Sequence, residues 1–234
     1  MLDAIFFDLD GTLLPMDYNT FMKGYLSLLC KAVAPLGYRA ETMVPAMFRG
    51  VDAMMQNDGS ASNYDRFWQV FFEVIGKESY EHVPVFDAFY SKEFHDAIAF
   101  TDPRPALARQ AVALAREKAH RVVLATNPLF PRVAVRSRLA WAGLSEDDFD
   151  WITDYENSST CKPNPAYYRQ IAEQLHVDPL QCLMVGNNTE EDIEAAQAAG
   201  LSTFLLTDCL IAKEPIPFSP KGSFEELLAY LRSI

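Results

Sequence analysis

The sequence predicts an α/β fold in which a Rossmann-like, mostly parallel sheet carries helices on both faces, with an all-α cap domain beside it. Two observations lead to this prediction. After residue 100, short apolar runs alternate with helical patterns, as is typical of parallel βαβ units. Residues 15–100 instead hold most of the methionines and aromatic residues and show few strand patterns. We therefore predict an α/β core domain over residues 1–14 and 101–234, and a helical cap domain over residues 15–100.

Each element of the core follows from a local pattern. The apolar run at residues 4–7 is rich in Ile and Phe and ends at a glycine turn, which predicts a buried strand. Further strands are expected at 121–125, 150–155, 181–185 and 201–206. Helices are expected at 105–120, 130–140, 163–176, 189–199 and 223–232. Within the cap, breaks at 36–37 and 56–62 separate several helices.

Composition and charge exclude several classes of function. The net charge of −12 comes without a basic stripe, so a nucleic-acid-binding surface is not expected. No apolar run approaches the ~18 residues of a membrane span, and the amino terminus lacks the pattern of a signal peptide. The four cysteines are widely spaced and form no metal-binding or disulfide pattern. We expect a reduced, cytoplasmic protein without nucleic-acid or membrane partners, and no pattern indicates its oligomeric state.

Two aspartates, Asp8 and Asp10, follow the first expected strand in the segment Asp-Leu-Asp-Gly-Thr. Open α/β sheets present their functional groups at the carboxyl ends of the strands. Neighbouring carboxylates repel each other unless a cation or a proton relieves the repulsion, so the pair indicates a functional site. The alternative is a turn that merely ends the strand, because Asp and Gly are ordinary turn residues.

Three further segments follow later expected strands. Thr126 and Asn127 can donate hydrogen bonds to phosphate oxygens, although the same residues are common in helix caps and turns. Lys162 directly precedes a helix-starting proline, where an anion would fit, and the alternative is an exposed loop lysine. Glu191 and Asp192 fall in the first turn of an expected helix, where acids also interact favourably with the helix dipole.

Together, the four segments resemble the motifs of the haloacid dehalogenase-like (HAD) superfamily, in the same order and at the ends of successive strands. The resemblance extends over residues 4–206. The helical insertion is similar to the C1-type cap of this superfamily, which closes over the site. The resemblance implies a Mg²⁺-dependent phosphatase that hydrolyses a small phosphorylated metabolite through an aspartyl-phosphate intermediate.

The resemblance also implies a role for each residue. Asp8 is expected to be the nucleophile, and Asp10 the general acid and base. Thr126, Asn127 and Lys162 are expected to bind the phosphoryl group, with Thr126 and Lys162 also counted as catalytic. The metal ligands implied for Mg²⁺ are Asp8, Asp10, Asn187 and Asp192, with Glu191 as a further ligand.

One position departs from the pattern of the superfamily. The residue after Gly186 is usually an acid that contacts the metal, but here it is Asn187, whose neutral amide attracts a cation less strongly. This departure supports an alternative function, a catalytically weak or inactive HAD-fold protein with a binding or regulatory role. A haloacid dehalogenase is disfavoured, because Asp10 supplies the second acid that is characteristic of the phosphoryl-transfer members.

The cap sequence does not identify the substrate. Asp17, Tyr18 and Arg49 are candidates for substrate contact, with ordinary surface positions as the alternative. The apolar side chains of the cap favour packing among its own helices over binding of an apolar ligand. They include Met43, Met47, Phe48, Met54, Met55, Phe67, Phe71 and Phe72.

Overall fold

A parallel sheet forms the centre of the molecule. The computed structural model describes residues 1–212 and 220–234, and within them six strands lie in the order β3-β2-β1-β4-β5-β6. Every neighbouring pair in this order is parallel. The strands are β1 Leu2–Phe7, β2 Ala119–Leu124, β3 Trp151–Ile152, β4 Cys182–Gly186, β5 Ser202–Leu206 and β6 Lys221–Gly222. The predicted α/β class and parallel sheet are confirmed.

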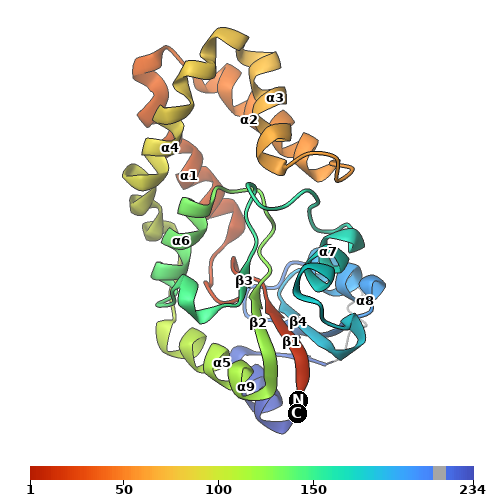
Figure 1. Ribbon diagram of the computed structural model, residues 1–234. Helices are drawn as coiled ribbons and strands as arrows, with labels where there is room; N and C mark the ends of the chain where they lie inside the picture. Colours follow the sequence, from red (N-terminus) through yellow and green to blue (C-terminus); the bar gives the residue numbers. More distant parts are fainter. Residues whose placement is uncertain (213–219) are drawn as a thin grey trace.

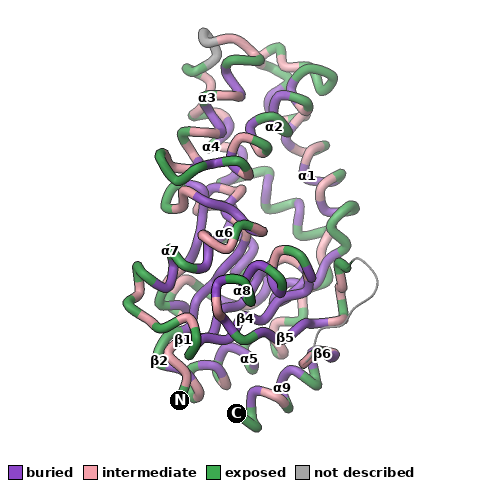
Figure 2. Tube along the Cα trace, turned by 90° about the vertical axis from the view of Figure 1, so that its right-hand side faces the viewer, coloured by how far each residue is buried: buried purple, intermediate pink, exposed green. Residues whose placement is uncertain are grey.

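Helices cover both faces of this sheet, as predicted (Figure 1). They are α5 Pro105–Lys118, α6 Arg132–Trp141, α7 Pro165–Leu175, α8 Ala195–Ala199 and α9 Phe224–Ser233. Alternate side chains of a strand point to opposite faces. Ile5 and Phe7 of β1 therefore pack with α5, α6 and α9, whereas Ala4 and Phe6 pack with α7 and α8. Figure 2 shows buried residues along the strands, and burial of both faces explains why the sequence of β1 is continuously apolar.

The chain between β1 and α5 is mainly helical. Its α-helices are α1 Tyr18–Val33, α2 Ala40–Met55, α3 Asn63–Ile75 and α4 Val83–Ser91, and 3₁₀ helices span Ala34–Leu36, Lys77–His82 and Glu93–Phe100. In Figure 1 these helices lie at the end of the molecule opposite the two labelled termini. The breaks expected at 36–37 and 56–62 fall between helices, as predicted. In the described part of the chain, no helix has the length and apolar character that a bilayer span requires.

The third strand is shorter than the sequence predicts. A strand was expected at 150–155, but β3 ends at Ile152. The Asp154 carboxylate accepts hydrogen bonds from the backbone N–H groups of Glu156 and Asn157 (3.0 and 2.9 Å), which turns the chain away from the sheet. These local side-chain bonds favour a turn over continuation of the strand.

Two further elements differ from the predictions. The helix expected at 189–199 begins with a π-helical turn over Thr189–Glu194 and becomes α-helical only in α8. The strand β6 is not predicted by the sequence, because Lys221 and Gly222 carry no alternating apolar pattern. It pairs with Leu205 and Leu206 at the edge of the sheet.

Helix α1 packs through Gly24 against the 3₁₀ helix Glu93–Phe100, and this contact gives a test of the fold. A Cβ added to Gly24 would lie 2.2 Å from ring carbons of Phe100. In an open helix Gly→Ala is stabilising by about 1 kcal/mol, but here we expect Gly24→Ala to lower the free energy of unfolding by about 1–3 kcal/mol through overpacking. Urea denaturation measures the change. In the double variant with Phe100→Ala the effect of Gly24→Ala should shrink, and a stabilised single variant would contradict the contact.

Candidate active site

The carboxyl ends of β1, β2 and β4 bring the predicted segments together. The backbone N–H of Asp8 donates to Val185 O (2.9 Å), and that of Ala125 donates to Phe7 O (2.8 Å), so strand pairing continues to the point where the polar residues begin. A cavity of about 250 Å³, here called the acidic cavity, lies at these ends. The residues that line it are Asp8, Asp10, Tyr18, Thr126, Asn127, Leu129, Phe130, Asn187, Asn188, Glu191, Asp192 and Ile211. All the predicted site residues except Lys162 are among them.

Lys162 is fully buried and joins two of the acids. Its Nζ donates to Asp8 Oδ1 (2.9 Å) and to Asp192 Oδ1 (2.6 Å). The alternative of an exposed loop lysine is therefore wrong. Burial by itself would lower the pKa of Lys162, but the carboxylates of Asp192 and Asp8 raise this pKa well above its ordinary value, so the ammonium group stays charged.

The second oxygen of Asp8 faces a hydroxyl group that the sequence analysis did not assign to the site. Thr12 Oγ1 is buried and lies 3.2 Å from Asp8 Oδ2 and 3.1 Å from Asn187 Oδ1. A hydroxyl group carries one proton and donates to only one of these oxygens at a time. A carboxylate oxygen and an amide oxygen thus converge on one point at the ends of β1 and β4.

Asn187 is fixed by the main chain around it. Its Nδ2 donates to the Cys209 carbonyl (2.6 Å), which directs Oδ1 toward Thr12. A Cβ on Gly11 would lie 2.3 Å from Asn187 Nδ2, and Gly11 has a φ of +85°, so both space and backbone conformation require glycine there. An aspartate at position 187 would place a carboxylate oxygen against the Cys209 carbonyl, whereas the amide of asparagine pairs with it.

Two acids of the turn after β4 face the cavity, with Asp192 buried and Glu191 half-buried. Asn188 caps this turn by accepting from the backbone N–H groups of Glu190 and Glu191 (3.1 and 3.3 Å). The N–H of Asn188 donates to Asp192 Oδ2 (3.0 Å), so both oxygens of Asp192 have partners within the protein. Burial and the nearby Asp192 raise the pKa of Glu191 to about 7. Burial also raises the pKa of Asp192 to about 6, although Lys162 opposes this shift.

Thr126 and Asn127 follow β2 in a loop that side chains hold in place. The Thr126 carbonyl accepts from the hydroxyl groups of Tyr167 (2.9 Å) and Thr153 (2.8 Å). Asn127 Nδ2 donates to Glu191 Oε2 (3.0 Å), while the buried Asn127 Oδ1 has no hydrogen-bond partner in the described part of the chain. Tyr167 and Thr153 therefore hold the loop on the side away from the cavity, and Thr126 and Asn127 line the cavity.

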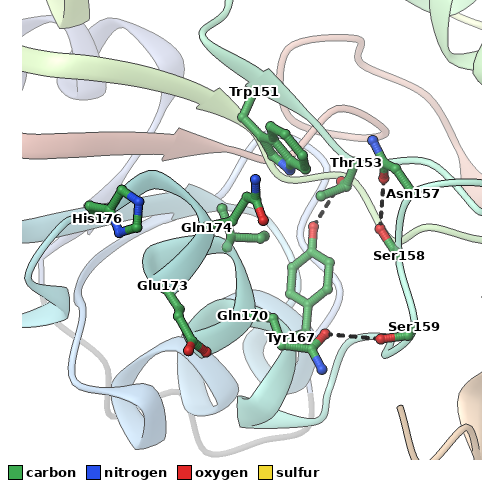
Figure 3. A pocket seen from close by; sticks show the side chains of 11 residues that line it. Trp151, Thr153, Asn157, Ser158, Ser159, Tyr167, Gln170, Glu173, Gln174 and His176 are labelled. Carbon is green, nitrogen blue, oxygen red and sulfur yellow. Dashed lines mark hydrogen bonds between the residues drawn. The ribbon is translucent and has the colours of Figure 1, made fainter. Parts of the chain in front are cut away.

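A second, wider hollow lies between β3 and α7 and has a volume of about 470 Å³ (Figure 3). Figure 3 shows the Tyr167 hydroxyl directed toward Thr153 and the Ser159 side chain directed toward Gln170. None of the predicted site residues lines this hollow. Tyr167 and Thr153 of this hollow bind the loop after β2, which is their only connection to the candidate site among the bonds described above. Because the predicted residues line the other space, we place the site at the acidic cavity.

Asp10 pairs with a cation that the sequence analysis missed. Arg138 of α6 is fully buried, and its Nη1 forms an ion pair with Asp10 Oδ2. The guanidinium carbon lies 4.4 Å from the centre of the Phe130 ring, a favourable cation–π arrangement. Asp10 Oδ1 and Arg138 Nη2 are both buried and have no hydrogen-bond partner among the described residues. Burial raises the pKa of Asp10, and the charge of Arg138 opposes the shift.

A sequence signal for Arg138 does exist. The residue lies four positions after Ala134 and three before Trp141, both buried on the inner face of α6. An arginine on such a face requires a partner, because an unpaired buried charge is costly. Its position therefore indicates a buried acid nearby, although it does not identify which acid.

The acidic cavity suits a divalent cation. Its four carboxyl groups outnumber the two buried cations, Lys162 and Arg138. The unpartnered Oδ1 of Asp10 is a donor of the kind that Mg²⁺ prefers, and so are the oxygens of Asp8 and Asn187, which face the Thr12 hydroxyl group. Within residues 1–212 and 220–234, no three His, Cys, Asp or Glu side chains form a metal site by themselves. Mg²⁺ does not need three, because it keeps several waters and takes one or two carboxylates with a substrate phosphate.

The three candidates for substrate contact have different positions. Tyr18 lines the acidic cavity, and its side chain is about half exposed. Asp17 is the N-cap of α1, where its carboxylate accepts from Thr20 N–H (2.8 Å). Arg49 is exposed on α2 and is not among the residues that line the cavity.

Comparisons with known proteins find relatives over nearly the whole chain. Residues 2–200 match a family model described as haloacid dehalogenase-like hydrolase. The chain is 27% identical over 218 residues to a glyceraldehyde 3-phosphate phosphatase of Methanothermobacter thermautotrophicus, covering 92% of this chain and 89% of the relative. It is 24% identical over 204 residues to a protein of the same name from Methanopyrus kandleri, covering 87% of this chain and 83% of the relative.

Solved structures show the same fold. A 2-haloacid dehalogenase from Pseudomonas syringae pv. Tomato DC3000 matches with a TM-score of 0.66 and 18% sequence identity, over 98% of this chain and 99% of that one. At this identity the likeness establishes the fold and carries no information about the reaction.

The ion pair of the buried Arg138 with the part-buried Asp10 gives a test of the site. We expect Arg138→Met to lower the free energy of unfolding by about 3–5 kcal/mol, because it leaves the Asp10 carboxyl group buried without its cation. The double variant Arg138→Met, Asp10→Asn should recover at least about 2 kcal/mol of this loss. Urea denaturation of the two single variants and the double variant in EDTA measures the coupling. Additive effects would show that the two side chains do not interact.

Proposed function

We propose that this chain, which belongs to the haloacid dehalogenase-like hydrolase family, is a Mg²⁺-dependent phosphatase of a small phosphorylated metabolite. Membership of the family makes it a hydrolase, and the resemblance of its four motif segments is thereby confirmed. The curated relatives, both named as phosphatases of glyceraldehyde 3-phosphate, support a phosphorylated small-molecule substrate. The observation that carries the proposal is the pair Asp8 and Asp10 beside the buried Lys162.

Asp8 is the proposed nucleophile. One of its carboxylate oxygens attacks the phosphorus atom, and the bond from phosphorus to the leaving oxygen breaks, which gives an aspartyl-phosphate. Hydrogen bonds from Lys162 and Thr12 hold this carboxylate in place. Thr126 and Asn127 are proposed to donate hydrogen bonds to the phosphoryl oxygens, whose charge Lys162 offsets.

Asp10 is the proposed acid and base. It donates a proton to the leaving oxygen and then accepts one from water, which attacks the phosphorus atom and regenerates the Asp8 carboxylate with release of phosphate. The raised pKa of Asp10, caused by burial, favours the protonated form that the first step requires. Arg138 binds the same carboxyl group and orients it. This second acid favours phosphoryl transfer over dehalogenation, although a dehalogenase shares the fold.

The proposed metal ligands are Asp8, Asp10, Asn187 and Asp192, with Glu191 beside them, and all five residues line the acidic cavity. When bound, Mg²⁺ would neutralise charge on the phosphoryl oxygens. Both oxygens of Asp192, like those of Asp8, have partners within the protein. A metal bound by either carboxylate would therefore share an oxygen with one of these partners, and Asp192 also holds Lys162.

We also propose that residues 15–100 act as a cap domain over a core of residues 1–14 and 101–234. Tyr18 of α1 lines the acidic cavity together with residues from the strand ends. The helical segment therefore forms part of the wall of the site. Such a wall excludes water from the reacting groups.

Asn187 favours a second candidate, a catalytically weak or inactive HAD-fold protein with a binding or regulatory role. Its amide is neutral and its nitrogen is bound to the Cys209 carbonyl (2.6 Å). A cation at this position gains less attraction than an acid would supply. This candidate predicts binding of a phosphorylated ligand without turnover.

The phosphatase proposal predicts phosphate release that depends on Mg²⁺ and on Asp8. We expect Asp8→Asn to lower turnover about a thousandfold or more, because an amide cannot form the aspartyl-phosphate. The measurement is inorganic phosphate released from a panel of monoesters, including glyceraldehyde 3-phosphate, with Mg²⁺ and with EDTA. Circular dichroism controls for folding of the variant. Ligand binding with no release from any monoester would favour the binding protein.

Asn187→Asp tests the metal site without a turnover assay. In EDTA we expect a loss of about 1–3 kcal/mol in the free energy of unfolding, because the new carboxylate oxygen faces the Cys209 carbonyl. Mg²⁺ should raise the Tm of this variant more than that of the natural protein, since a carboxylate is the stronger ligand. Asn164→Asp is the matched control, because Asn164 caps α7 and either residue caps a helix well. Equal Mg²⁺ responses in all three proteins would contradict the assignment.

A further inference from the structure

An apolar recess adjoins the acidic cavity. It has a volume of about 70 Å³ and is enclosed by side chains from α1, α2, α3 and α4 and by the loops that follow β2 and β3. Tyr18, Leu129 and Phe130 line both spaces. Tyr18 and Phe48 are 53% and 48% exposed, so the recess opens where these two side chains lie. It therefore lies next to the position proposed for the phosphoryl group.

The lining of the recess is mainly apolar and carries no charge. Met, Leu, Val, Phe, Trp and Tyr make up the whole lining, and no charged or amide side chain of the described residues belongs to it. The hydroxyl groups of Tyr25 and Tyr90 bind each other (2.8 Å). Trp68 is buried, and its indole N–H interacts with the hydroxyl group of Tyr155, which also lines the recess. An occupant therefore meets mainly apolar surface, and the polar groups in the lining are tyrosine hydroxyls and the indole N–H of Trp68.

The apolar residues of the helical segment divide into two groups. Packing among the helices, as the sequence favours, accounts for the fully buried residues Met43, Met54, Phe71 and Phe72. In contrast, Met47, Phe48 and Phe67 line the recess. The half-exposed ring of Phe48 gains nothing from helix packing on its open side, but it would gain from an apolar group that covers it. Packing alone thus explains only part of the apolar content.

We propose that the apolar recess binds the organic group of the substrate and that this group is a short, unbranched alkyl chain. The proposal rests on the phosphatase function proposed above. A charged group would lose its hydration in the recess without gaining a partner of opposite charge, and a polyhydroxylated group would exchange water for a lining with few polar groups. A cavity of ~150 Å³ is known to hold benzene, so a recess of about 70 Å³ is too small for an aromatic ring.

Titration of phosphonates into the protein with Mg²⁺ tests this proposal without turnover, because the proposed reaction does not cleave their carbon–phosphorus bond. From methyl- to butylphosphonate we expect the affinity to rise about threefold to fourfold for each methylene, until the recess is full. Propylphosphonate should bind roughly tenfold more tightly than 2,3-dihydroxypropylphosphonate, which has the same carbon chain. Isothermal titration calorimetry measures both comparisons.

A pair of surface variants assigns the effect to the recess. Phe48→Asp places a charge at its opening and should remove the dependence of affinity on chain length. Val74→Asp is the matched control, because Val74 is similarly exposed (45%) on α3 and does not line the recess. This control should keep the chain-length dependence of the natural protein.

The outcomes separate the recess from the reaction. Affinity that does not change with chain length, or tighter binding of the dihydroxypropyl compound, would overturn the recess proposal. Phosphate release from propyl phosphate, and its loss in Asp8→Asn, tests the phosphatase independently. Chain-length dependence without release from any monoester would overturn the phosphatase and leave the recess as an alkyl-binding site. Phosphate release without chain-length dependence would support the phosphatase and overturn the recess proposal.

Discussion

One buried ammonium group, that of Lys162, joins the segments that follow the carboxyl ends of the strands. Lys162 has no exposed surface and joins Asp8, after β1, to Asp192, in the turn after β4. Without it, two buried carboxyl groups would lie together, and burial of unpaired like charges costs several kcal/mol. The same contacts fix the loop before α7. Lys162 therefore links three segments that lie far apart in the sequence: the end of β1, this loop and the turn after β4.

The acidic cavity and the apolar recess beside it differ in the chemistry of their linings. The strand ends supply four carboxyl groups with their two buried cations, whereas the helical segment supplies aromatic and aliphatic side chains. A phosphate monoester has the same division, because its phosphoryl end is charged and its organic end can be apolar. Under the proposed reaction, the bond that breaks would lie at the boundary between the two linings, where Tyr18, Leu129 and Phe130 belong to both.

Local patterns allowed the fold class to be predicted. The parallel sheet follows from alternating apolar runs and helical stretches, and the gathering of polar residues at one edge follows from that topology. Contacts between distant side chains could not be predicted in this way. Arg138 lies 128 residues from Asp10, and the bond between Asn187 and the Cys209 carbonyl depends on how two loops meet. The early end of β3 coincides with a turn held by one carboxylate, Asp154.

The central position of β1 has a consequence for how the chain is made. Leu2 pairs with Ala119 on one side, and Ala4 pairs with Cys182 on the other, so the strand leaves the ribosome long before either partner. Contacts between residues so far apart form slowly, because a long loop must close first. Until β4 emerges, an apolar strand that bears Asp8 has an unpaired edge, which is a template for aggregation. The segment with the proposed nucleophile is thus an apolar strand that waits for both of its partners while the chain is made.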